Sequence, residues 1–150
     1  MANSFVCCYV HVVFSTYRRQ PLIDESWRQR LWAYMGGTLG NAHTVPMSVG
    51  GTEDHCHALI AIPATAALSH AVQLLKGGSS HWIRQNITSA EGFAWQEGYG
   101  AFSVSPSACA DVVAYIGAQE QHHTSHSFRD EYLNLLVENG IDFNERYVWG

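Results

Sequence analysis

The alternation of apolar and polar side chains along the chain predicts strands interleaved with helices. Residues 5–16 are rich in β-branched and aromatic side chains, with Val10, Val12 and Phe14 on one face of a strand. Asp24 can cap a following helix whose apolar side chains recur at helical spacing. Further strands are predicted at residues 45–49, 56–62 and 99–105, and further helices from residue 68, from 106 to about 122 and from 129 to 138.

Two of these helices carry residues that bear on where they begin and end. The Gly77-Gly78 pair predicts that the second helix is interrupted or ended there. The Ser105-Pro106 pair is typical of a helix start, with a hydroxyl cap followed by proline at the first helical position. The helix that begins there is expected to run to about His122.

The order strand, helix, strand, strand, helix, strand, followed by helices, predicts an α+β fold of the ferredoxin-like, or split β-α-β, type. In this arrangement one antiparallel sheet has helices on one face and an open opposite face, and additional helices follow at the C-terminus. With 150 residues and no repeat or linker, the chain is predicted to form a single domain, residues 1–150. Many unrelated functions use this fold, so it does not identify one.

Composition and charge narrow the classes of function. Apolar residues make up 47% of the chain and charged residues 14%, which is typical of a folded globular protein. The apolar stretch Phe5–Phe14 is interrupted by His11 and precedes the basic Arg18-Arg19 pair, the reverse of a signal peptide. No apolar run is long enough to span a bilayer. We therefore expect a cytoplasmic protein with no membrane partner.

The basic residues are few, and the cysteines show no metal-binding spacing. A net charge of −5, with Lys76 as the single lysine, argues mildly against a protein that binds duplex DNA mainly through its phosphates. The four cysteines include no CxxC pair and are interpreted as buried small side chains. Composition alone therefore favours neither a nucleic-acid-binding protein nor a zinc or disulfide framework.

A His-x-His pair is the most distinctive local pattern. His55 and His57 are two residues apart on a predicted strand, so their side chains project from one face while Cys56 points to the other. Two neutral imidazoles at this spacing can share one divalent metal ion. The plainer interpretation is a pair of hydrogen-bonded histidines on a half-exposed strand, and the pair alone does not exclude it.

A second candidate lies on the helix after Pro106. Tyr115 and Gln119 are four residues apart, so they lie one above the other on the helix surface. A tyrosine hydroxyl can attack a phosphodiester to give a covalent phosphotyrosine, and an amide oxygen can ligate a nearby metal ion. By themselves, these residues are explained more simply as a core tyrosine and a solvated glutamine.

Taken together, these patterns resemble the single-tyrosine transposases of the insertion-sequence 200/605 type, within the HUH class of single-strand nucleases. The similarity covers nearly the whole chain, in the order of the family. It is carried by HVVFSTYRR at 11–19, EDHCHALIAIP at 53–63, LLKGGSSHWIRQ at 74–85, WQEGYGAFSVS at 95–105 and VVAYIGAQEQHH at 112–123. The chain departs from the family pattern in three ways. Cys56 stands where a bulkier aliphatic residue is commoner, Tyr17 stands where the family often has a lysine, and the overall basic character of the family is missing.

The resemblance implies a role for each matching residue. His55 and His57 match the metal ligands of the HUH motif, Gln119 matches the third ligand, and Tyr115 matches the nucleophile. It also implies a Mg²⁺ or Mn²⁺ cofactor, a homodimer, and single-stranded DNA with hairpin ends as the partner. Members of this family cut one strand, keep a 5′-phosphotyrosine, release a free 3′-OH and rejoin strands to move an insertion sequence.

Weaker candidates surround these four residues. His11 is expected on the same face as the histidine pair, where it lies near the site or simply packs there. Phosphate contacts and ordinary surface charge explain four basic residues about equally well: Arg18, Arg19, Lys76 and Arg84. His122 and His123 resemble extra metal ligands, although packing or solvation at a helix end explains them more simply.

Alternative functions share the same residues. A domesticated relative that processes repeated palindromic elements would keep the same four site residues. A non-catalytic module that binds hairpin DNA, or a zinc-binding or purely structural domain, would also fit the fold. The active-site sequence alone does not separate the first of these from an active transposase.

Overall fold

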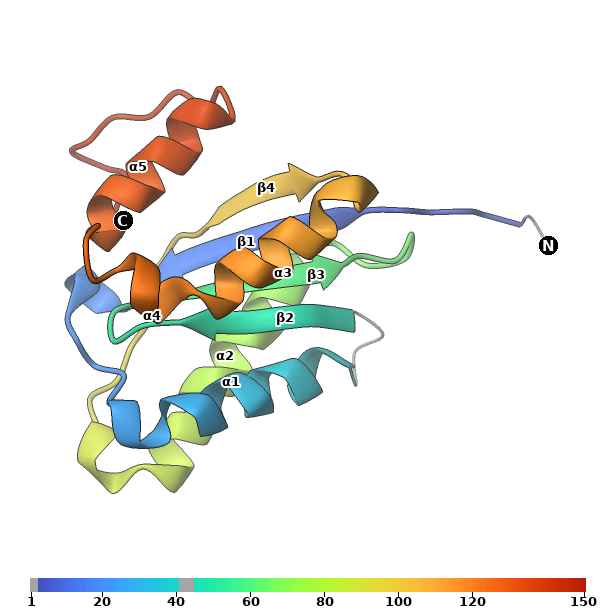
Figure 1. Cartoon of the computed structure of the whole chain (residues 1–150). Coiled ribbons are helices and arrows are strands. Elements are labelled where there is room, and N and C mark those ends of the chain that lie inside the picture. Colours follow the sequence, from blue (N-terminus) through green and yellow to red (C-terminus); the bar gives the residue numbers. More distant parts are fainter. Residues whose placement is uncertain (1–2, 41–44) are drawn as a thin grey trace.

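Four strands form one antiparallel sheet in the computed structural model, which describes residues 3–40 and 45–150 (Figure 1). The strands are β1 (Tyr9–Ser15), β2 (Val45–Gly51), β3 (His55–Ala61) and β4 (Gly100–Val104). Their order across the sheet is β2-β3-β1-β4, with β1 and β3 paired at the centre. Together with the crossover helices, this order is the predicted ferredoxin-like α+β fold.

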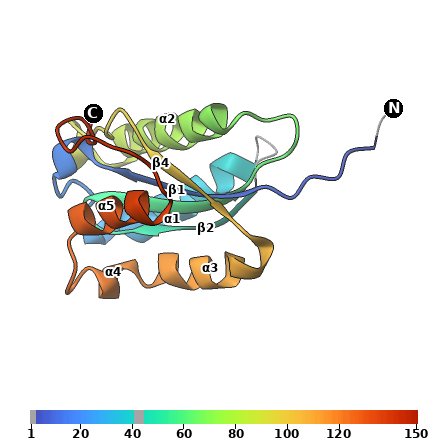
Figure 2. The ribbon, with the colours of Figure 1, turned by 90° about the horizontal axis from the view of Figure 1, so that it is seen from above.

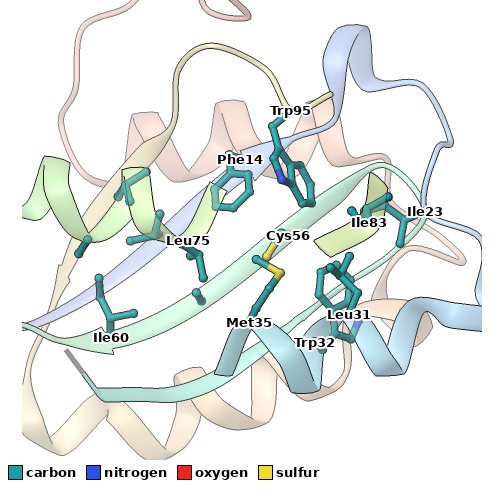
Figure 3. Close-up of a cluster of buried hydrophobic side chains, with 14 of the residues drawn as sticks. Phe14, Ile23, Leu31, Trp32, Met35, Cys56, Ile60, Leu75, Ile83 and Trp95 are labelled. Atoms are coloured by element: carbon teal, nitrogen blue, oxygen red, sulfur yellow. The ribbon is translucent and has the colours of Figure 1, made fainter. Parts of the chain in front are cut away.

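One face of the sheet is covered by α1 (Glu25–Gly40) and α2 (Leu68–Asn86). Alternate residues of the central strands, among them Val12, Phe14 and Cys56, point into this layer and are fully buried (Figure 3). Leu31 of α1 and Leu75 of α2 meet them there. As predicted, Cys56 therefore faces the helices while its two histidine neighbours face the other way.

The opposite face is not open, which corrects the sequence-based expectation. Figure 2 shows α3 (Cys109–Gly117) and α4 (Gln119–His122) on the side of the sheet away from α2. Leu59 of the sheet packs with Ile116 of α3, and Val13 packs with Phe128 of α5 (Phe128–Glu138). Apolar residues lie among the histidines on this face, and their burial from water is favourable. The C-terminal helices bury them.

Two predictions about helix ends are also wrong. Helix α2 continues through the Gly77-Gly78 pair, because Leu75, Ser79 and Ile83 on either side are buried against the core. The helix expected from 106 to 122 instead begins with a 3₁₀ turn, Pro106–Ala108, and is broken at Ala118 between α3 and α4. Proline does occupy the first helical position, but the Ser105 hydroxyl contacts the Ser107 hydroxyl and caps no backbone N–H.

Two of the four cysteines also differ from expectation. Cys56 and Cys109 are buried as predicted, but Cys7 and Cys8 are exposed because strand β1 begins only at Tyr9. Within the described residues, no helix combines the length and the apolar character that crossing a membrane requires.

Candidate active site

Strand β3 presents His55 and His57 on the face covered by the C-terminal helices, and both side chains are fully buried. Strand β1 runs alongside and places His11 on the same face, with its Nε2 atom 2.8 Å from Nδ1 of His57. The prediction that His11 shares this orientation is therefore confirmed. Three imidazoles from two central strands line the floor of the site.

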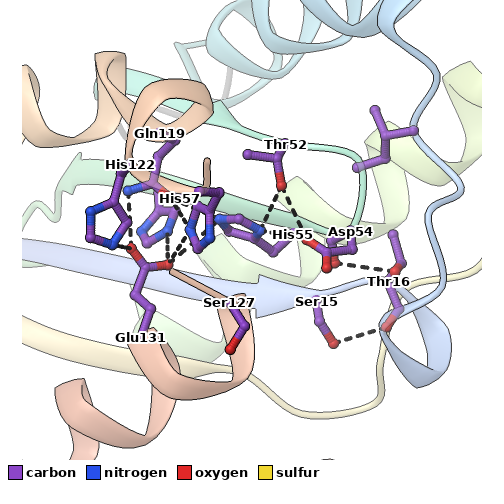
Figure 4. A network of polar contacts seen from close by, with 12 residues as sticks. Ser15, Thr16, Thr52, Asp54, His55, His57, Gln119, His122, Ser127 and Glu131 are labelled. Carbon is purple, nitrogen blue, oxygen red and sulfur yellow. Dashed lines mark hydrogen bonds and ion pairs between the residues drawn. The ribbon is translucent and has the colours of Figure 1, made fainter. Parts of the chain in front are cut away.

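Both rings of the His-x-His pair are held on their outer side, which directs the Nε2 atoms to a common space. Nδ1 of His55 lies 2.7 Å from Oδ1 of Asp54 and 3.0 Å from the hydroxyl of Thr52 (Figure 4). Nδ1 of His57 is held by His11. Partners of this kind fix ring orientation and increase the basicity of a ligating nitrogen.

Two helices place oxygen atoms against these inward nitrogens. Oε1 of Gln119, at the start of α4, lies 2.8 Å from Nε2 of His55. Oε1 of Glu131, on α5, lies 3.0 Å from Nε2 of His57 and 3.6 Å from Nε2 of His55. An ion pair between Arg28 of α1 and Glu120, at 2.8 Å, anchors α4 and thereby positions Gln119.

These donors fit a divalent cation. His55 donates from Nδ1 to Asp54, so in the neutral imidazole its Nε2 lone pair faces the Gln119 carbonyl oxygen. Two acceptors at 2.8 Å are favourable only with a positive charge between them. Neighbouring ligands of an octahedral ion with bonds near 2.1 Å lie about 3 Å apart, which matches the spacing of these atoms. His55, His57 and Glu131 indeed form a buried group capable of holding a metal.

Tyr115 reaches the same cluster from α3. Its hydroxyl donates a hydrogen bond to Oε2 of Glu131, and its ring lies 5.7 Å from the ring of His57 between centroids. Burial, with the nearby Glu131 carboxylate, raises the pKa of Tyr115 well above its usual value. In the absence of a cation the hydroxyl therefore keeps its proton.

The charges of the site follow from burial and hydrogen bonding. Burial lowers the pKa of His57 to about 4, against the opposing hydrogen bond to Glu131, so the ring is neutral and able to bind a metal. Burial alone would raise the pKa of Glu131, but hydrogen bonds from His123 and His57 outweigh it and hold the pKa far below its usual value. The site thus combines neutral imidazoles with one carboxylate.

A cavity of about 420 Å³ opens beside Tyr115. Its lining includes His11, His122 and Glu131. The tyrosine hydroxyl is therefore next to a space that can receive part of a substrate.

The four basic residues proposed as phosphate contacts lie outside this cluster. Lys76 and Arg84 are on α2, which packs on the other face of the sheet. The Lys76 ammonium donates to three backbone carbonyls, of Gln96, Glu97 and Gly98, so a phosphate contact would displace one of them.

Arg18 and Arg19 lie just after β1. Arg18 is exposed and has a positive φ of 54°. The guanidinium of Arg19 lies 4.0 Å from the centre of the Trp149 ring. Their role as DNA contacts stays a prediction, as does that of Arg84, which is exposed.

Glu131 is the member of this cluster that the sequence analysis did not identify. It lies on the buried stripe of α5, one position before Tyr132 and three after Phe128. An acidic residue on an otherwise apolar stripe is the signal that could have identified it, because a buried carboxylate requires partners.

Comparison with solved structures supports the fold. A Deinococcus radiodurans R1 protein with a provisional assignment as a transposase aligns with a TM-score of 0.63 and 18% identity, over 79% of this chain and 96% of that one. A REP-associated tyrosine transposase, bound to a REP hairpin, aligns with a TM-score of 0.58 and 13% identity, over 82% of this chain and 73% of that one.

A family model identifies the chain more directly. The model described as "Transposase IS200 like" matches residues 4–119, which include the histidine pair, Tyr115 and Gln119. The chain therefore belongs to the IS200-like transposase family. A search among curated proteins gives no match.

Proposed function

We propose that this protein is a metal-dependent DNA transposase that cleaves and rejoins single-stranded DNA through Tyr115. The observation that carries the proposal is the meeting of Tyr115, His55, His57 and Gln119 in one cluster built from a single chain. A nucleophile beside a set of converging metal ligands is the arrangement that phosphodiester cleavage requires.

The chain supplies a nucleophile and a carboxylate that orients it. The Tyr115 oxygen attacks the phosphorus of the scissile phosphodiester, forming a bond to phosphorus while the bond from phosphorus to the 3′ oxygen breaks. Glu131, which already accepts a hydrogen bond from the hydroxyl, orients the phenol, the phenol proton passes to water as the bond to phosphorus forms, and the leaving 3′ oxygen takes a proton from water. The products are a 5′-phosphotyrosine and a free 3′-OH, and attack by a 3′-OH reverses the step and joins strands.

His55, His57 and Gln119 would hold the ion, Mg²⁺ or Mn²⁺, with Glu131 beside them. A bound divalent ion supplies Lewis acidity, which neutralises charge on a phosphate oxygen. The neutral state of the buried His57 ring keeps its nitrogen available for this role.

The proposed substrate is single-stranded DNA with hairpin ends. The REP-associated relative bound to a hairpin supports this choice, as does membership of a transposase family. We also propose a homodimer, although the cluster needs no residue from a second copy. In that dimer the tyrosine would act on the site of its own subunit.

The test uses single-stranded oligonucleotides copied from the DNA on either side of the gene, with Mg²⁺ or Mn²⁺. A covalent protein–DNA adduct on a denaturing gel is expected with the parent protein and not with Tyr115→Phe. Tyr147→Phe is the matched control, because this tyrosine is 66% exposed and lies outside the cluster. A Tyr115→Phe protein that still forms the adduct would overturn the assignment of the nucleophile.

The same experiment addresses the second candidate, a non-catalytic module that binds hairpin DNA. The hairpin bound by the REP-associated relative is the observation in its favour. Tight binding of the oligonucleotides without any adduct, in the presence of either metal, would favour this module over a transposase. Cleavage confined to palindromic repeats away from the gene would favour a domesticated relative.

A further inference from the structure

His123 lies against Glu131 and two of the expected metal ligands, His55 and Gln119, closer than its position at a helix end suggests. Its Nε2 atom is 3.0 Å from Oε1 of Gln119 and 3.1 Å from Oε1 of Glu131, and its side chain is 9% exposed. Its ring centre is 4.5 Å from that of His55. Of the interpretations that the sequence left open for His123, solvation at a helix end does not apply, because the side chain is packed in the cluster.

The outer nitrogen of His123 is held in the same way as those of His55 and His57. Its Nδ1 atom donates to the backbone carbonyl of His126 at 2.6 Å. This bond fixes the ring so that Nε2, the atom that donates to Glu131 when no metal is bound, faces the shared oxygen atoms, as in ligating histidines that are oriented by an outer partner.

Glu131 completes the enclosure from the side of α5. Its side chain is 3% exposed, and its Oε1 atom lies about equally far from Nε2 of His57 and Nε2 of His123, at 3.0 and 3.1 Å. Its other oxygen faces Tyr115 and the amide of Gln119. One carboxylate oxygen is thus free to ligate a metal while the other contacts the nucleophile.

We propose that His123 and Glu131 are metal ligands in addition to His55, His57 and Gln119, and that the resulting centre prefers Mn²⁺ to Mg²⁺. The inference rests on the metal site of the proposed function. Three imidazole nitrogens and two oxygens form a donor set that suits transition ions. Mg²⁺ prefers oxygen ligands and retains several waters, for which five protein donors leave little room.

His122 lies beside the proposed centre and, with His123 and Glu131, could form a second metal-binding group, but it contacts the other oxygen of Glu131. Its Nε2 atom lies 3.4 Å from Oε2 of Glu131, the oxygen that faces Tyr115, and its side chain is 30% exposed. His122→Gln therefore provides a matched control on the same helix, one residue away from His123.

The test measures binding of Mn²⁺ and Mg²⁺ to the metal-free full-length protein without DNA. The electron paramagnetic resonance signal of free Mn²⁺ reports binding, and Mg²⁺ is then added as competitor. We expect His123→Ala and Glu131→Gln each to weaken Mn²⁺ binding by about tenfold or more, and His122→Gln to leave it within about twofold. A tenfold excess of Mg²⁺ should displace little Mn²⁺ from the parent protein.

Near-parent Mn²⁺ affinity in both His123→Ala and Glu131→Gln would overturn the proposal, and so would displacement by an equal concentration of Mg²⁺. If a variant fails to fold, judged by circular dichroism, pulsed magnetic resonance of Mn²⁺ in the parent protein gives the answer. Nitrogen couplings from three imidazoles are expected there, and couplings from only two would contradict it. Because no DNA is present, these outcomes do not depend on whether strand cleavage occurs.

Discussion

At the scale of single residues, Asp54 is expected to control metal affinity without touching the metal. Its carboxylate holds Nδ1 of His55 at 2.7 Å and thereby fixes the tautomer that leaves Nε2 free. Asp54→Asn replaces this acceptor with an amide and should weaken Mn²⁺ binding by about tenfold or more, measured by titration of the metal-free protein. Asp142→Asn, in an exposed position, is the control, and equal affinities in the two variants would contradict the prediction.

His11 leads to a prediction about acid stability. Burial, followed by the neighbouring His57, lowers the pKa of His11 to about 3, whereas the unfolded chain has the usual value near 6.5. Between these two pKa values the unfolded state therefore binds more protons at His11 than the folded state does. The contribution of His11 to the free energy of unfolding is complete above about pH 6.5 and is lost as the pH falls toward 3.

Urea unfolding of the metal-free protein at pH 7 and pH 4.5 checks this prediction. We expect His11→Gln to lose less stability between the two pH values than the parent, because the variant has no imidazole to protonate at this position. Equal losses in the two proteins would show that His11 does not contribute.

The residues of the candidate site were predictable one by one, and so was the face on which His11 lies, whereas Glu131 was not. Side chains alternate between the two faces of a strand, which placed His55 and His57 on one face of β3. The four-residue separation of Tyr115 and Gln119 placed these two side chains close together on a helix surface. Glu131 comes from a separate helix, and its approach depends on how α5 docks against β1 and β4. A pattern within one element carries no information about that docking.

At the scale of elements, Gly50 allows α3 to approach β2 closely. A Cβ atom at this position would lie 2.8 Å from the backbone oxygen of Ile116. Gly50→Ala should therefore push α3 away and cost about 1–3 kcal/mol of stability. It should also reduce adduct formation, because α3 carries Tyr115 and Gly50 pairs with His57.

The matched substitution is Gly77→Ala, in the interior of α2, where a Cβ atom would meet nothing within 4 Å. This variant should be more stable than the parent by about 0.5–1 kcal/mol, since alanine favours a helix more than glycine does. Urea unfolding of both variants gives the comparison. Similar free energies of unfolding for the two would show that α3 adapts to a side chain at position 50.

The wrong predictions about elements have a common physical origin in tertiary packing. Helical periodicity extends through Ala118, but α4 departs from α3 there and is held to α1 by the ion pair between Arg28 and Glu120. Glycines at 77 and 78 weaken a helix locally, yet burial of Leu75 and Ile83 outweighs that cost. Helix propensity depends on the local sequence alone. The break at Ala118 and the continuation of α2 through its glycines depend instead on contacts with other helices and strands.

At the scale of the whole molecule, the order of elements was sufficient to predict the sheet. Short connections and alternating strand faces restrict a β-α-β-β-α-β chain to few arrangements, and the observed order β2-β3-β1-β4 is one of them. It was less evident that the C-terminal helices cover the face of the sheet that carries the histidines. Val13 and Phe102 on the histidine side of the sheet are apolar, which indicates in retrospect that this face is buried.

The scarcity of basic residues predicts how DNA binding should respond to salt. Of the eight lysines and arginines, Arg28 and Arg129 pair with acidic side chains and Lys76 donates to backbone carbonyls. The arginines left for phosphates are Arg18, Arg19, Arg30, Arg84 and Arg146. Each phosphate contact with single-stranded DNA contributes about 0.7 to the slope of log affinity against log salt concentration, so the slope should not exceed about 3.5 in magnitude per subunit.

Fluorescence anisotropy with a labelled single-stranded oligonucleotide that forms no hairpin, at several NaCl concentrations, measures this slope. Arg18→Gln and Arg84→Gln should each lower its magnitude by about 0.7, because each removes one phosphate contact. Arg129→Gln should leave it unchanged, since that guanidinium already lies 3.1 Å from the Glu145 carboxylate. An unchanged slope in both Arg18→Gln and Arg84→Gln would mean that these two arginines are ordinary surface charges and do not contact phosphates.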